Sequence, residues 1–479
     1  MSGPGTARKR GLAVVVAVLL SCSACGLRIS DTAARSAIQP TGIATVYANG
    51  TGTGPVGSGG PTAPGQTGAN TGAGSGGATL SSGPGGPTTG NSGGPGGSIG
   101  STGAGGPSGP TCSGTLSTIN IGSVGEQSGV FAPFLYPGVQ AVQAWVAKVN
   151  AAGGVNCHPI KYLVKDDGGD PSAAQAAVQE LVTQDHVVAM VYMDSPIAGQ
   201  ATVSYLAAHG IPVIGSEGGS DWFYNSPNYF PQITSAVTAL TTLITVIAKI
   251  GAKTGKHTFG AVSCLEVPLC SSVYTLAPKL AAQNHLTLAY NAQASITQPN
   301  FTSACQSAKA AHVDIFDVGM DTNSIERAIS NCSSVGFHPL YITGGALVSP
   351  SLIADPDAEG VYLGSFTAPY TDTANPQIAA MTAALARYAP GVPPSIDAAA
   401  GWSSALLFQL ALERATSPTP AGVLAAMYTV HNEDLDGLTY PMTFHAGQNA
   451  PRTVCFWYGQ IHHGTLITPA GFPSGRVCA

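Results

Sequence analysis

Charged and aromatic side chains are missing from a long stretch near the start of this 479-residue chain. Residues 51–110 contain no Lys, Arg, Asp, Glu, Phe, Tyr or Trp, yet they hold 24 of the 62 glycines. Such a stretch has little apolar surface to bury and nothing to offset the entropy of ordering its backbone. We therefore expect a disordered Gly/Ser/Thr/Pro-rich linker over residues 23–111, with a mean reach on the order of 50 Å.

The folded part, from about residue 115 onward, lacks the patterns of several function classes. No basic run follows the first ten residues and the net charge is −6, so no nucleic-acid partner is expected. The motif G-x-S-x-G occurs at 90–94 and 96–100, and G-x-G-x-x-G at 52–57, but all three lie in the linker. A nucleophile elbow needs a strand before it and a helix after it, and a dinucleotide loop needs a βαβ unit. We expect neither enzyme activity nor a cofactor.

The N-terminus has the parts of a secretory signal. Arg8, Lys9 and Arg10 precede an apolar run over 12–20, which is too short to span a bilayer of roughly 30 Å. The ending Leu-Leu-Ser-Cys at 19–22 resembles the lipobox of bacterial lipoproteins. This resemblance implies a signal peptide over 1–22, acylation of Cys22 and an extracytoplasmic protein anchored to the cell membrane. Cys25 is the alternative acylation site, and an ordinary secreted protein is the alternative to a lipoprotein.

The other eight cysteines favour disulfide bonds in an exported chain. A metal site is not expected, because the folded part has no C-x-x-C pair, and His462 and His463 would face opposite ways on a strand. Eight cysteines allow 105 pairings. Neighbourhood in the sequence favours Cys112 with Cys157, Cys264 with Cys270, Cys305 with Cys332, and Cys455 with Cys478.

Short β-branched runs alternate with longer amphipathic ones along the folded part. This alternation predicts parallel sheets covered by helices on both faces, and the length of this part predicts two lobes. Strands are expected at 118–124, 160–164, 187–193, 211–215, 258–263, 286–290, 313–318 and 340–343, and helices at 137–151, 172–183, 196–209, 235–250, 299–311 and 322–334.

The segment Asn150–Pro171 (NAAGGVNCHPIKYLVKDDGGDP) joins two of these predicted units. Gly153 and Gly154 allow the left-handed turn that ends a helix, while Asp170 and Pro171 suit the first positions of the next helix. A calcium loop is the alternative use of the aspartates, but the bidentate acid twelve positions on is missing. We expect these aspartates to be mainly structural.

Several segments together resemble the leucine/isoleucine/valine-type solute-binding proteins of bacterial ABC importers. They are GSVGEQSG at 122–129, the Asn150–Pro171 segment with the helix and strand that follow it, GIPVIGS at 210–216, and DGLTYPMTF at 436–444. The resemblance implies a type I periplasmic-binding fold with three crossovers, a ligand cleft and ABC permease subunits as partners. Lobe 1 would comprise 112–236 and 365–440, and lobe 2 would comprise 237–364 and 441–479.

Open parallel sheets bind ligands at the carboxyl ends of their strands, which selects candidate residues in lobe 1. After the third strand, Ser195 is either a ligand contact beside a helix N-terminus or a simple helix cap. In the resembled family, the loop after the fourth strand holds an amino acid's carboxylate; Gly219 stands where a threonine is usual, so Ser220 would substitute. The lobe 1 candidates are Ser128, Phe131, Ser195, Glu217, Gly218, Gly219, Ser220 and Trp222.

Lobe 2 departs from the resembled family. Leu265–Leu269 replaces a Tyr-Gly pair, and Ser324 stands where a glutamate would bind an ammonium group. Asp321 with Thr322 is the expected replacement, and helix capping is the alternative role of both residues. We expect a monomeric protein that carries a small polar solute, such as an amino acid or amide, to an importer by closing its cleft. The alternative is a tethered ligand sensor or cell-envelope interaction protein without a transporter.

Overall fold

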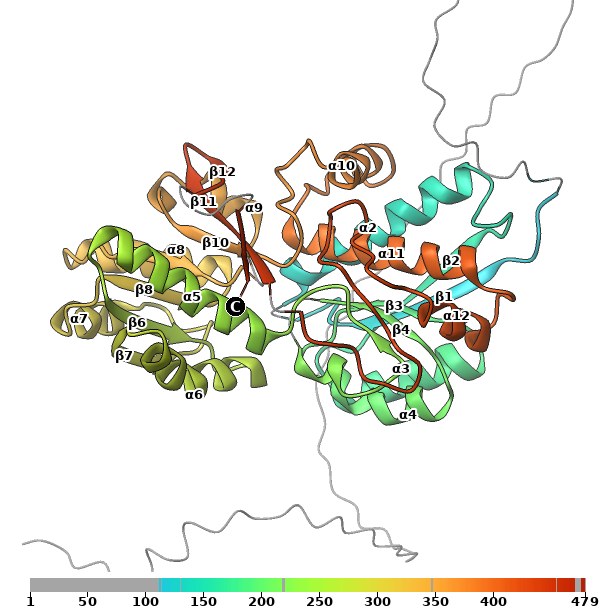
Figure 1. Ribbon diagram of the computed structural model, residues 1–479, viewed down its shortest axis with the longest axis horizontal. Helices are drawn as coiled ribbons and strands as arrows, with labels where there is room; N and C mark the ends of the chain where they lie inside the picture. Colours follow the sequence, from blue (N-terminus) through green and yellow to red (C-terminus); the bar gives the residue numbers. More distant parts are fainter. Residues whose placement is uncertain are drawn as a thin grey trace, which may run out of the picture. The chain divides into compact units, whose positions relative to one another are not determined.

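The computed structural model describes residues 112, 114–129, 131–217, 220–345, 348–453, 455–469 and 475–478, all of which lie in one compact unit. The expected signal peptide and linker, Cys22, Cys25, Gly218 and Gly219 lie outside the described residues. Two α/β lobes are present, as the sequence predicts, and each is built around its own sheet (Figure 1).

Lobe 1 contains a five-stranded parallel sheet of order β2-β1-β3-β4-β5. Its strands are β1 (Ile119–Gly125), β2 (Ile160–Asp166), β3 (Met190–Met193), β4 (Val213–Ser216) and β5 (Tyr229–Phe230). Its helices are α2 (Ala132–Ala151), α3 (Pro171–Thr183), η1 (Gly199–Thr202), α4 (Val203–Ala208), η2 (Asp221–Tyr224), α10 (Pro376–Tyr388), α11 (Ile396–Arg414) and α12 (Pro420–Met427).

Lobe 2 contains an eight-stranded sheet of order β12-β11-β10-β9-β8-β6-β7, with β13 also paired to β11. Its strands are β6 (Thr258–Ser263), β7 (Thr287–Gln293), β8 (Ile315–Gly319), β9 (Leu340–Thr343), β10 (Tyr362–Ser365), β11 (Cys455–His462), β12 (Thr465–Ile467) and β13 (Arg476–Cys478). Its helices are α5 (Ala236–Thr254), α6 (Pro268–Gln283), α7 (Thr302–Ala310), α8 (Thr322–Ser334), α9 (Pro350–Ala354) and η3 (Pro356–Ala358).

The second sheet is mixed, whereas the sequence predicts parallel strands. Strand β11 runs antiparallel to β10, β12 and β13. Among the described residues no helix lies between α12 and β11, so no crossover helix fixes the direction of β11. In Figure 1 the orange-red strands β10, β11 and β12 lie together, while the orange helices α10 and α11 lie beside the blue-green helix α2.

The chain passes between the lobes in three segments, after β5, after β10 and after α12. Buried Gln232, in the first segment, accepts from the Ser216 N–H at 2.9 Å and donates to the Ala400 carbonyl at 2.9 Å. Two residues on, the Thr234 hydroxyl donates to the Cys455 carbonyl at 3.1 Å. The first and third segments are therefore tied together where the lobes meet.

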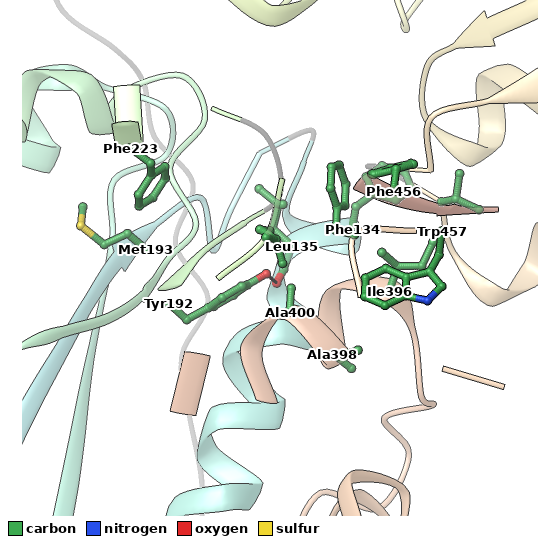
Figure 2. Packing of buried hydrophobic residues seen from close by; sticks show 14 of the residues in the cluster. Phe134, Leu135, Tyr192, Met193, Phe223, Ile396, Ala398, Ala400, Phe456 and Trp457 are labelled. Atoms are coloured by element: carbon green, nitrogen blue, oxygen red, sulfur yellow. Dashed lines mark hydrogen bonds between the residues drawn. The ribbon is translucent and has the colours of Figure 1, made fainter. Parts of the chain in front are cut away.

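Helices α2 and α11 of lobe 1 approach each other where both have glycine. A Cβ built on Gly401 would lie 2.0 Å from the Gly138 carbonyl oxygen, so only glycine permits this contact. Figure 2 shows Tyr192 reaching toward Leu135 of α2, and its hydroxyl donates to the Leu135 carbonyl at 3.3 Å. In the same view Phe134 and Ile396 lie near Phe456 and Trp457 of β11, so the core of lobe 1 continues toward lobe 2.

The four disulfides pair Cys112 with Cys157, Cys264 with Cys270, Cys305 with Cys332, and Cys455 with Cys478. These are the pairs that neighbourhood in the sequence favours. Cys112 and Cys157 meet because β1 and β2 are adjacent and parallel, with each cysteine ahead of its strand.

Asp166, at the end of β2, and Asp170 accept hydrogen bonds from backbone N–H groups, which is the structural role that the sequence predicts. Asp170 caps α3 by accepting from the N–H groups of Ser172 and Ala173, and Pro171 opens the helix. Asp166 Oδ1 accepts from three backbone N–H groups of its own and the neighbouring loop. No helix among the residues that the structure describes has both the length and the apolar character to cross a membrane.

Candidate functional site

A cavity of about 300 Å³ lies between the two lobes. Its walls follow the carboxyl ends of β3 and β4 in lobe 1 and of β6, β8 and β9 in lobe 2, which is where open parallel sheets bind ligands. Helices α2, α5 and α6 and the segment after β10 complete the lining. Most of the lining side chains are apolar, and the larger ones are Phe131, Leu135, Ile197, Trp222, Leu240, Leu243, Val267, Val273, Met320 and Phe366.

Aromatic side chains form much of the lobe 1 wall. Trp222 stacks on Phe223 with ring centroids 3.9 Å apart, and a Cβ on Gly199 would lie 2.5 Å from the Trp222 ring. Glycine at 199 therefore makes room for the indole. The indole thus gives this wall an aromatic surface, while its buried Nε1 has no hydrogen-bond partner among the described atoms.

Glu217 follows β4 and supplies a buried carboxylate to the same wall, with 5% of its surface exposed. Its Oε1 accepts a hydrogen bond from the Ser220 hydroxyl, whereas its Oε2 has no partner among the described atoms. Burial raises the pKa of Glu217 to about 7, against the lowering effect of the Ser220 hydrogen bond. The Ser220 side chain thus positions one oxygen of this carboxyl group.

In lobe 2, the wall is shaped by the loop between β6 and α6. The Cys264–Cys270 disulfide closes this loop, and both cysteines line the cavity. The Ser263 hydroxyl donates to the Cys270 carbonyl at 3.3 Å, so the loop is held to the end of β6 as well. Leu240 and Leu243 of α5 line the same cavity.

Asp317 is the carboxylate of the lobe 2 wall. It lies within β8, is 2% exposed, and its Oδ1 has no hydrogen-bond partner among the described atoms. Burial raises the pKa of Asp317 to about 8. A buried acid without donors costs free energy, so Asp317 is unexpected in a strand whose other central residues form core.

The cavity lining that the structure describes contains no Lys, Arg or His. A third acid, Asp221, lines the cavity, and its Oδ1 lies 2.6 Å from Arg452 Nη1. The Arg452 guanidinium also lies over the Tyr224 ring, 5.0 Å from its centroid. The Arg452 guanidinium, which contacts the lining residue Asp221, is thus paired with a carboxylate.

The predicted site residues fall into two groups in the structure. Phe131, Glu217, Ser220 and Trp222 line the cavity. Ser128 is exposed and its N–H donates to Asp166, while the buried Ser195 hydroxyl donates to Asp167 at 2.5 Å. Ser195 does not cap the next helix, whose N-cap is Ala198.

Asp321 and Thr322 lie just beyond Met320, which does line the cavity. Asp321 caps α8 by accepting from the Ser324 N–H and hydroxyl, and Thr322 Oγ1 accepts from the Ser349 N–H at 2.7 Å. Asp321 thus has the capping role that the sequence offers as the alternative. Solute contacts by Ser128, Ser195, Asp321 and Thr322 stay a prediction.

Among the described residues, Glu359, His462 and His463 hold metal-ligand atoms within 4.8 Å of one another. The expectation that the two histidines face opposite ways is wrong: β11 ends at His462, His463 has a positive φ of 49°, and the ring centroids are 4.0 Å apart. All three side chains are exposed, and Glu359 already accepts from His462 Nδ1 at 2.8 Å and from the His463 N–H. The group is satisfied without an ion.

Two sheets that share a cleft at their strand ends define the solute-binding class of two-lobed α/β proteins. Residues 118–465 match the family model described as "Periplasmic binding protein", and the chain belongs to that family. This is a solute-binding family.

Solved structures share the fold at low sequence identity. A fatty acid ABC transporter substrate-binding protein from Thermomonospora curvata has a TM-score of 0.63 and 21% identity, covering 78% of this chain and 94% of its own. A branched-chain amino acid ABC transporter protein from Thermus thermophilus with bound valine has a TM-score of 0.64 and 16% identity, covering 74% and 95%.

A solute-binding protein of an ABC transporter from R. palustris, in complex with benzoate, has a TM-score of 0.61 and 16% identity, covering 73% of this chain and 95% of its own. The search of curated proteins found no match.

Proposed function

We propose that this chain is an extracytoplasmic, lipid-anchored protein that binds a small solute between its lobes and delivers it to an ABC importer. The observation that carries the proposal is the cavity at the carboxyl ends of the strands of both sheets. A solute held there contacts both lobes at once, so it favours the closed arrangement by differential affinity. The permease subunits would then recognise the closed form.

The residues that we assign to the solute are those that line the cavity from both sides. Phe131 and Trp222 offer aromatic surface, Glu217 with Ser220 offers a positioned carboxyl group, and Asp317 faces them from lobe 2. The structures with bound valine and with benzoate are named for ligands of this size class, and the Thermomonospora curvata protein is named for fatty acids. These names support a small solute with an apolar part.

A thermal-shift screen tests solute binding. The panel comprises amino acids, amides, small peptides, sugars, nucleosides, and aliphatic and aromatic acids, amines and alcohols. A ligand at 100 times its dissociation constant stabilises the protein by about 2.7 kcal/mol. The variant Trp222→Ala should lose the shift, whereas Tyr136→Ala, at an exposed tyrosine of α2, should retain it. No shift with any compound would contradict the proposal.

The lipid anchor has its own test, because Cys22 lies outside the described residues. Cys22→Ser should move the full-length chain from the membrane fraction to the soluble exported fraction, and Cys25→Ser should leave it in the membrane fraction. The reverse result would assign the anchor to Cys25. A soluble exported wild-type chain would contradict anchoring while leaving solute binding in place.

Transport is separated from sensing by an uptake measurement. Deletion of the gene should abolish uptake of the solute found in the screen, and the wild-type gene should restore it. Unchanged uptake together with a lost transcriptional response to the solute would favour the tethered-sensor alternative.

A further inference from the structure

Two buried carboxyl groups stand on opposite walls of the cavity, and each has a buried oxygen with no side-chain hydrogen-bond partner among the described atoms. Glu217 Oε2 belongs to lobe 1 and Asp317 Oδ1 to lobe 2. Buried polar atoms in folded proteins are nearly always paired, and each unpaired one needs an explanation. Both side chains also line the cavity, so a ligand that brings donors to both walls can contact the two carboxyl groups.

The charged side chains of the cavity disfavour an anionic solute. The described lining has three acids and no basic side chain, and Arg452, which lies beside it, is paired with Asp221. A carboxylate solute would find no cation to pair with in this poorly solvated space, which is unfavourable. An ammonium group would instead meet acids that can release their protons, and the aromatic rings of Phe131, Trp222 and Phe366, whose faces attract cations.

The rest of the lining indicates that the remainder of the solute is apolar. Leu135, Leu240, Leu243, Val267 and Met320 surround the space with hydrocarbon, and the cavity holds about 300 Å³. A hydrophilic amine would leave its other polar groups unpaired there, whereas an alkyl or aryl group would be desolvated favourably.

We propose that the solute is a hydrophobic amine, bound as its ammonium form, with Glu217 of lobe 1 and Asp317 of lobe 2 as its acceptors. This inference rests on the proposed function, because it names the solute class of the same cleft. A single ammonium group has three donors and can therefore engage both acids. Contact with an acid on each lobe couples recognition of the amine to closure of the cleft.

Binding of an ammonium group should release protons, which gives the inference a readout beyond affinity. Burial raises the pKa values of Glu217 and Asp317 to about 7 and about 8, so near pH 7 Asp317 is mostly protonated and Glu217 is partly protonated. An adjacent cation lowers a carboxyl pKa. The titratable groups that interact electrostatically with these two acids are Glu126, Tyr192, Asp194, Tyr224 and Asp397 for Glu217, and Tyr458 for Asp317.

The test is isothermal titration calorimetry at pH 7 with probes matched in size and differing in head group. They are 2-phenylethylamine, 3-phenylpropanoate and 2-phenylethanol, and n-hexylamine, hexanoate and 1-hexanol. We expect each amine to bind at least tenfold more tightly than its matched acid. Titrations in two buffers of different ionisation enthalpy should show release of roughly one proton or more per amine bound.

Variants assign the effect to the two acids. Glu217→Gln and Asp317→Asn should each weaken amine binding by about 10- to 100-fold, and the double variant should release no proton. Binding of the alcohols should change little, which reports that the cavity is still folded. Asp357→Asn, at an exposed position of lobe 2, removes the same charge away from the cavity and should leave amine binding unchanged.

The outcomes separate this inference from the proposed function. Acids or alcohols that bind as tightly as the amines would overturn the inference and leave solute binding intact. Amine binding that survives in the double variant would also overturn it. If none of the six probes binds, the inference is wrong. If no compound of the thermal-shift panel stabilises the protein either, the proposed function is also wrong.

Discussion

Replacement of Asp317 by asparagine should change how the stability of the protein depends on pH. Burial raises the pKa of Asp317 from 3.8 to about 8, so the folded state keeps a proton that the unfolded state releases. The free energy of unfolding therefore falls as pH rises between these two values. The stabilising effect of this proton is complete below pH 3.8 and is lost as pH approaches 8.

The magnitude follows from the proton difference between the folded and unfolded states. One proton corresponds to about 1.4 kcal/mol for each pH unit. Between pH 5 and pH 7, the wild type should lose about 3 kcal/mol relative to Asp317→Asn, which has nearly the same shape and no proton to release. Other buried acids with raised pKa values, such as Glu126 and Asp397, are present in both proteins and cancel in the difference.

The assay is urea denaturation of the oxidised wild type and variant at pH 5, 6 and 7. Asp357→Asn serves as the control, because it removes an exposed aspartate of the same lobe. We expect the free energy of unfolding of Asp317→Asn to rise relative to that of the wild type at each step in pH. The difference between Asp357→Asn and the wild type should stay constant. A difference between Asp317→Asn and wild type that stays constant within about 0.5 kcal/mol would refute the reasoning.

Three further substitutions test the packing, capping and cross-linking of lobe 1. Gly401→Ala should lower the free energy of unfolding by about 1–3 kcal/mol, because its Cβ meets the Gly138 carbonyl, as measured by chemical denaturation. Asp170→Ala should cost about 1 kcal/mol in the same assay, because α3 loses its cap. Replacing Cys112 and Cys157 by serine opens a loop of 45 residues and should cost about 4 kcal/mol, seen as a lower melting temperature.

Each of these three substitutions has a control. Gly114→Ala adds a methyl group where no atom lies within 4 Å, so no loss is expected. Asp170→Ser keeps a capping oxygen and should recover most of the loss. Reduction opens all four disulfides, so the reduced wild type should be no more stable than the oxidised double serine variant. Equal losses in the glycine control, or no recovery with serine, would contradict the stated causes.

Much of the fold could be predicted from the sequence, because strand and helix signals are local. The predicted strands at 258–263 and 340–343 match β6 and β9, and the predicted helix at 322–334 matches α8. The antiparallel strands β11, β12 and β13 were not predicted. Their direction depends on where the chain re-enters lobe 2, which no local pattern records.

The candidate site was predictable only in part. The rule that ligands lie at strand ends correctly led to the loops containing Phe131, Glu217 and Trp222. Ser195 sits in the right loop, but its hydroxyl is held by Asp167, a partner from another loop that sequence spacing does not reveal. Asp317 was missed because it lies within a strand; a lone acid in the apolar run IFDVG was the available signal.

The coupling of solute binding to lobe closure is tested most directly by the distance between the lobes. Spin labels attached to Ala176→Cys in α3 and Gln306→Cys in α7, both exposed, report this distance by pulsed electron resonance. With the tightest-binding compound of the screen at saturation, the account predicts a narrower distance distribution with a shifted mean. A bound compound that leaves the distribution unchanged would contradict it.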